Sequence, residues 1–172
     1  MIATTWRRTT TARWWGRRSA RGDHDRPVEV LAVLQHARAI VEAGWVQNRW
    51  TVERPHLLSP AGSAAVAGTP VGTTSACLVG AVALAVRARD PRADLAVDTG
   101  PALAFVWDAV HDGGRAAGRS APREVRLARM RELARWNDER GRTRDDVVAV
   151  LDRAAARVVA GVVDPGAEAS RV

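Results

Sequence analysis

The chain has 172 residues, a length that suits one domain with its own hydrophobic core rather than two. Its formal net charge is +7, and all 26 basic residues are Arg. A single cysteine, Cys77, excludes an internal disulfide framework, and Cys and His do not stand at the spacing of a structural zinc site. We therefore expect a cytoplasmic protein that uses no metal and no cofactor.

The first 26 residues form a basic segment in which Thr, Arg and Trp follow neither a helical nor an alternating period. We predict that residues 1–26 are a disordered tail, that residues 27–161 form a helical domain, and that residues 162–172 are a frayed C-terminus. A start codon assigned too far upstream would leave the tail without a role. Phosphate pairing by Arg and stacking by Trp would instead bring it to nucleic acid or an anionic surface.

The first predicted helix starts at Val28 and stops at Gly44. Its apolar residues recur at spacings of three and four, namely Leu31, Leu34, Ala37, Ile40 and Val41. Residues 45–53 then alternate loosely, which predicts a short extended arm near Trp50. Residues 54–74 are rich in Pro, Gly, Ser and Thr and predict a long mobile loop.

A strongly apolar segment follows this loop. Every residue from Ala76 to Val86 is apolar or Gly. The segment is far shorter than the roughly 20 residues that a transmembrane helix needs, so no membrane span is predicted. A helix without a polar face is a buried one, and we therefore place Ala76–Val86 at the centre of the fold.

Three more helices are predicted towards the C-terminus. Asp98 or Thr99 caps the first of them, which ends at Gly113. Ser120 caps the second, which runs to about Trp136.

The last helix starts at Thr143, which is followed three residues later by Asp146, as in a capping box with Asp in place of Glu. Gly161 closes this helix. The prediction is an all-α fold, a compact bundle of about five helices around the central apolar helix.

Three short motifs stand in order along the chain: Ala43-Gly44-Trp45, Cys77-Leu78-Val79-Gly80-Ala81, and Trp136-Asn137-Asp138 followed by Gly141-Arg142-Thr143. Their arrangement resembles an uncharacterised family of small proteins that is common in high-GC Gram-positive bacteria and is known as a domain of unknown function. The resemblance covers residues 28–160 and implies a compact helical domain with no established activity, cofactor or partner. The chain departs from the family in its longer 54–74 loop and in its N-terminal tail.

Four arginines of the penultimate helix are candidate binding residues: Arg123, Arg126, Arg129 and Arg135. The first three recur every three residues, which predicts a basic stripe along the helix. Such a stripe suits an acidic partner, either protein or nucleic acid, although a solvated helix face has the same pattern. We therefore predict a non-catalytic interaction module.

Cys77 supports an alternative prediction, an enzyme or a thiol-based sensor. A thiol near a helix N-terminus can be partly ionised, whereas a cysteine in an apolar segment usually packs as a small hydrophobic residue. Asn137 and Asp138 could place an amide and a carboxylate at the rim of a pocket, or they could satisfy the amides of a turn.

Overall fold

Helices dominate the part of the chain that the structure, a computed structural model, describes: residues 26–53, 73–111 and 121–163. In chain order the elements are α1 (Arg26–Ala43), β1 (Thr51–Glu53), β2 (Thr73–Ala76), α2 (Leu78–Arg89), α3 (Leu95–Asp98), α4 (Gly100–Val110), α5 (Arg123–Asp138) and α6 (Arg144–Val163). Within these ranges five helices are longer than one turn and the strands are very short. The predicted all-α fold is therefore confirmed.

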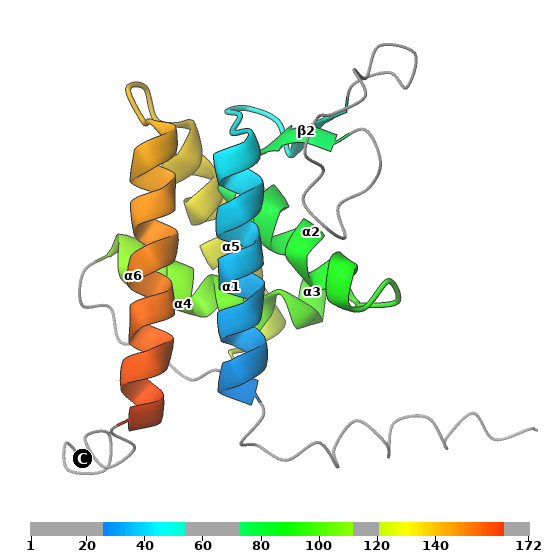
Figure 1. The fold of residues 1–172 in the computed structure, drawn as a ribbon, viewed down its shortest axis with the longest axis vertical. Helices are drawn as coiled ribbons and strands as arrows, with labels where there is room; N and C mark the ends of the chain where they lie inside the picture. The colour runs from blue at the N-terminus through cyan, green and yellow to red at the C-terminus, as the bar shows by residue number, and fades with distance from the viewer. Residues whose placement is uncertain (1–25, 54–72, 112–120, 164–172) are drawn as a thin grey trace, which may run out of the picture.

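The first and last helices lie side by side and run in opposite directions, with α4 and α5 behind them and α2 on the side of α1 away from α6 (Figure 1). The apolar stripe of α1 is buried here, as the spacing of Leu34, Ala37 and Val41 predicts. α6 contributes Val147 and Leu151 to the same core. Helices that meet along such stripes bury a continuous apolar surface, which is the main stabilising contribution in a bundle.

α2 is the central helix. It packs against α1, α5 and β2, and its side chains are buried around almost the whole helix, among them Leu78, Val82 and Ala85. The helix begins two residues later than predicted, because Ala76 belongs to β2 and Cys77 is the N-cap. The Cys77 Sγ accepts a hydrogen bond from the Gly80 amide at 3.3 Å, as a capping side chain does.

A two-stranded antiparallel sheet, β1 with β2, leads into α2. Thr51 pairs with Ala76 and Val52 with Ser75. The extended arm predicted near Trp50 thus contains β1. The predicted 54–74 loop is wrong at its C-terminal end, because residues 73 and 74 belong to β2. β2 consists largely of small polar residues, which are also common in loops. They form a strand because they pair with β1, and this pairing cannot be seen in the sequence of β2 alone.

Gly80 allows the residue just before β1, Trp50, to approach α2 closely. A methyl group at this position would collide with the carbonyl oxygen of Trp50. That carbonyl is held in place, because it accepts a hydrogen bond from the Cys77 amide at 3.0 Å. A glycine is therefore required where the backbones of the strand and the helix meet.

The helix ends confirm the predicted capping box of α6 and the predicted cap position at Thr99, but they contradict the predicted stop at Gly161. At the start of α6 the Thr143 amide donates to Asp146 Oδ2 at 2.9 Å, and the Asp146 amide donates to Thr143 Oγ1 at 3.2 Å, which confirms the capping box. Gly161 does not end this helix, which continues to Val163. Thr99 is the N-cap of α4, but its side chain makes no capping hydrogen bond.

Other predictions fall on residues outside the described ranges. They include most of the 1–26 tail, most of the 54–74 loop, the Gly113 stop and residues 164–172. The prediction that Ser120 caps the penultimate helix is wrong, because α5 begins at Arg123 and Pro122 is its N-cap. Within the described ranges, no helix combines the length and the apolar character that a membrane span requires.

Candidate functional site

The four candidate arginines of α5 do not share one exposed face. Arg123 and Arg135 are exposed, Arg126 is half-buried, and Arg129 is only 7% exposed. Both a binding stripe and a solvated helix face need exposed side chains, so Arg129 fits neither prediction. In an α-helix each step of three residues falls about 60° short of a full turn, so the row from Arg123 to Arg129 winds around α5 towards α4.

Arg129 stabilises the contact between α4 and α5. Its guanidinium lies over the Trp107 ring, 5.0 Å from the ring centroid, and His111 stacks on the same indole with centroids 4.3 Å apart. The Trp107 indole also donates to Glu132 Oε2 at 2.6 Å. Desolvated cation–π contacts of this kind contribute about 2 kcal/mol, so Arg129 acts in packing rather than at the surface.

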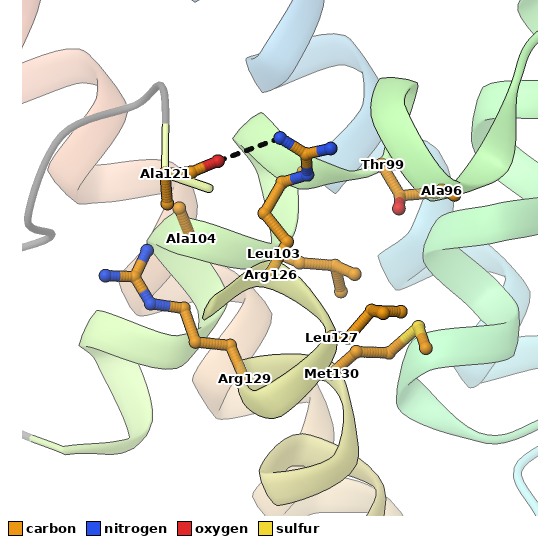
Figure 2. Close-up of a pocket in the computed structure, with 10 residues that line it drawn as sticks. Ala96, Thr99, Leu103, Ala104, Ala121, Arg126, Leu127, Arg129 and Met130 are labelled. Atoms are coloured by element: carbon orange, nitrogen blue, oxygen red, sulfur yellow. Dashed lines mark hydrogen bonds between the residues drawn. The ribbon is translucent and has the colours of Figure 1, made fainter. Parts of the chain in front are cut away.

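The Arg126 side chain lies at the other end of the contact between α4 and α5. Its Nη1 donates to the Ala121 carbonyl at 2.8 Å, and Figure 2 shows the guanidinium between Ala121 and Thr99. The side chain lines a small cavity beside the first turn of α4.

The exposed face of α5 carries Arg123, Arg131 and Arg135, which we call the outer arginines. Glu124 and Glu132 lie on the same face. No outer arginine makes an ion pair with any residue in the described ranges. The predicted set of binding residues omits Arg131, although it lies on this face.

Asn137 is fully buried, so the prediction of a pocket rim is wrong for this residue. Its Oδ1 accepts hydrogen bonds from Trp45 Nε1 at 2.9 Å and from the Leu78 amide at 3.0 Å. Its Nδ2 donates to the Val46 carbonyl at 3.2 Å and to Asp138 Oδ1 at 2.8 Å. The side chain joins α5 to the start of α2 and to the turn after α1.

Asp138 and Gln47 extend this arrangement, which we call the polar hub. Asp138 Oδ1 accepts from the Asn48 amide at 2.8 Å. Gln47 donates to the carbonyls of Asn137 and Glu139 at 2.9 and 3.0 Å. Asp138 thus satisfies an amide of the turn after α1, in line with the other prediction, whereas the amide that Asn137 satisfies belongs to Leu78, the first residue of α2. The hub occupies every hydrogen-bonding position of the Asn137 side chain and the Oδ1 atom of the half-buried Asp138.

Cys77 borders the polar hub and is 6% exposed. Burial raises the pKa of its thiol above the ordinary value, and the hydrogen bond from the Gly80 amide opposes this shift only in part. The thiol is therefore protonated near neutral pH, which weakens it as a nucleophile. Within the described ranges no group of His, Cys, Asp and Glu could hold a metal ion.

Comparison with known proteins finds one family and no individual relative. No curated protein and no solved structure matches the chain. Residues 25–157 match the model of a family described as a family of unknown function (DUF6197). This range includes the polar hub, Cys77 and all the arginines of α5. Because the match covers most of the sequence, the chain belongs to this family of unknown function.

Proposed function

We propose that the protein is a non-catalytic interaction module that binds an acidic surface of a partner protein through the outer arginines of α5. The observation that carries this proposal is the exposure of Arg123, Arg131 and Arg135 without an ion-pair partner in the described ranges. Arginine suits protein interfaces, because its planar guanidinium binds carboxylates through two parallel hydrogen bonds.

The backbone under these arginines supports a binding role. Leu133 and Asn137 are fully buried and fix α5 against the core. A surface on an anchored helix loses little backbone freedom on binding, so more of the contact energy contributes to affinity. The residues with catalytic potential are less available, because Cys77, Asn137 and Asp138 are engaged in structural hydrogen bonds.

The charge distribution favours a protein partner over nucleic acid. The described ranges contain 16 Arg and 14 acidic residues, a net charge of +2, so +5 of the total +7 lies outside them. Glu124 and Glu132 also interrupt the positive charge of the exposed α5 face. A nucleic-acid surface concentrates positive charge, whereas a mixed face suits a protein surface of complementary pattern.

We would test this with the full chain and two double variants. Arg131→Glu with Arg135→Glu reverses two outer arginines, and Arg49→Glu with Arg92→Glu makes the same charge change at two exposed positions outside α5. Binding of a labelled polyglutamate peptide and of a DNA duplex would be followed by fluorescence anisotropy over a salt series. We expect the α5 variant to bind the peptide about tenfold more weakly, while the other variant stays near wild type.

Three other results of this binding experiment would contradict the proposal. Equal losses in both variants would mean that net charge, and not α5, determines binding. Tight DNA binding with a steep salt dependence, weakened by the α5 variant, would replace the protein partner with nucleic acid. Wild-type affinity in the α5 variant would exclude the outer arginines.

A further inference from the structure

Exposed apolar side chains gather at one end of the pair formed by α1 and α6. Val28 at the start of α1 is 66% exposed, and Val159 and Val162 near the end of α6 are 46% and 54% exposed. Six large apolar residues are exposed in the described ranges, and half of them lie here. Single exposed apolar residues are common in soluble proteins, whereas a contiguous patch indicates contact with another segment or molecule.

The register of the two helices makes these residues contiguous. Arg38 Nε donates to Asp152 Oδ1 at 2.7 Å, so these two positions lie opposite each other. Because the helices are antiparallel, a step of seven residues towards the same end leads from Arg38 to Leu31 and from Asp152 to Val159. Seven residues are close to two helical turns, so Leu31 and Val159 lie on the same side of the helix pair as the ion pair.

Val28 and Val162 lie three residues further along, at the end that the first turn of α1 shares with the last turn of α6 (Figure 1). We call Val28, Leu31, Val159 and Val162 the apolar patch. Four side chains offer far less area than the roughly 800 Å² per partner that a stable complex buries, which argues against a second copy as the occupant. A segment tethered beside the patch needs less area, because its effective concentration is in the mM range.

The N-terminal segment, residues 1–25, is tethered at this position, because α1 begins at Arg26. It contains the adjacent pair Trp14 and Trp15, whose rings bring a large apolar area to a contact. Eleven residues lead from Trp15 to Arg26, and an extended chain of that length reaches about 35 Å. The apolar patch lies within the first two turns of α1, so the segment is long enough to fold back over it. Residues 164–172, which follow α6, contain no aromatic residue.

The charges near the patch also favour this segment. Glu42 and Asp152 both accept hydrogen bonds from Arg38, at 2.7 Å each, so two carboxylates share one guanidinium about two turns from the patch. Neither carboxylate makes another ion pair within the described ranges. Residues 1–25 contain six arginines and two aspartates, a net charge of +4. The uncompensated negative charge therefore attracts the segment to this side of the helix pair.

We propose that residues 1–25 fold back onto their own chain and that Trp14 and Trp15 cover the apolar patch. The indole rings contact Val159 and Val162, and the arginines of the segment lie towards Asp152. This surface is distinct from the outer arginines, which lie on α5.

The test follows the valine methyl resonances of the full chain by NMR. Ring currents of the two indoles should shift the Val28, Val159 and Val162 methyls, and the double variant Trp14→Ser with Trp15→Ser should remove this shift. Val97 and Val125 are exposed on α3 and α5 and serve as internal references that should not move. Trp6→Ser is the matched control, since it removes an indole from the same segment and should leave the patch methyls as in the wild type.

Trypsin cleavage within the N-terminal segment gives a second readout in the full chain. A contact that is half populated at the effective concentration of the tether protects the segment about twofold, so Val159→Asp should speed cleavage by about this factor. Val97→Asp makes the same change at an exposed position away from the patch and should cleave like the wild type.

Three results would overturn the proposal. The first is that the patch methyls have the same shifts in the wild type and in the variant without Trp14 and Trp15. The second is that the difference grows with protein concentration, which would make a second copy the occupant. The third is that Val159→Asp and Val97→Asp are cleaved at equal rates.

Discussion

At the scale of the residue, a buried asparagine has two acceptor and two donor positions to satisfy, and Asn137 satisfies all four. Two of its partners, Trp45 and Leu78, lie 92 and 59 residues away in the sequence. The side chain therefore fixes contacts that helix propensity alone cannot establish. A buried polar group with every partner in place favours one arrangement of these segments over others.

Asn137→Ala should destabilise the protein by about 2–4 kcal/mol, because the Leu78 amide and the Trp45 indole would lose their acceptor inside the core. Urea unfolding followed by circular dichroism would measure the loss. Gln47→Ala is the matched control at the edge of the hub, where a partly exposed amide is removed. Its cost should be about 1 kcal/mol. Equal losses in the two variants would contradict the central role given to Asn137.

At the scale of the element, the capping box of α6 should make stability depend on pH. Hydrogen bonds from the Thr143 amide and hydroxyl lower the pKa of Asp146 below its ordinary value. A carboxylate with a lowered folded-state pKa stabilises the fold above its unfolded-state pKa, and this contribution is lost as the pH falls through the folded-state pKa.

Asp146→Asn should therefore lower the Tm at pH 7 and reduce the decrease in Tm that the wild type shows on acidification below about pH 4. Thermal unfolding from pH 7 to pH 2 would measure both effects. Asp145→Asn is the control, because Asp145 lies in the same turn and makes only a long contact of 3.5 Å with Arg144. A steep acid transition in Asp146→Asn, equal to that of the wild type, would contradict the assignment.

The elements that the sequence predicts well are those with strong local signals. The apolar spacing of α1, the continuous apolar segment of α2 and the Thr143–Asp146 pair of α6 each reflect contacts within one helix or one face. The sequence does not predict β2 or α3, because an element of four residues is too short to show a hydrophobic period. The orientation of Arg129 is missed for another reason, since it depends on the position of Trp107 in α4.

The polar hub shows the same limit at the candidate sites. The sequence identifies the Trp136-Asn137-Asp138 motif and its possible role in turn amides. It does not identify Trp45 and Leu78 as partners, because hydrogen bonds between distant segments leave no periodic pattern. The cavity beside Arg126 is likewise formed by separate elements, α3, α4 and α5.

At the scale of the whole molecule, α6 supplies part of the hydrophobic core, which is incomplete without this helix. Val147, Val150, Leu151, Ala154 and Val158 of this helix are buried. Full burial of a Val or Leu side chain contributes about 1.5–3 kcal/mol, so their sum is comparable with the total stability of a small domain, about 5–15 kcal/mol.

A chain that stops at residue 143 should therefore lose its cooperative unfolding transition, and its helix content should fall by far more than the share of α6. Thermal unfolding followed by circular dichroism would show this. The control chain stops at residue 163 and keeps all of α6. A cooperative transition in the shorter chain would show that α1 to α5 form a stable unit.

The pairing of α1 with α6 also has a consequence for synthesis on the ribosome. About 100 residues separate the end of α1 from the start of α6, which corresponds to roughly 5–20 s of translation. During that time the nascent chain presents the apolar side of α1 without the helix that covers it. The rate of translation thus determines how long this surface is accessible to chaperones and to aggregation.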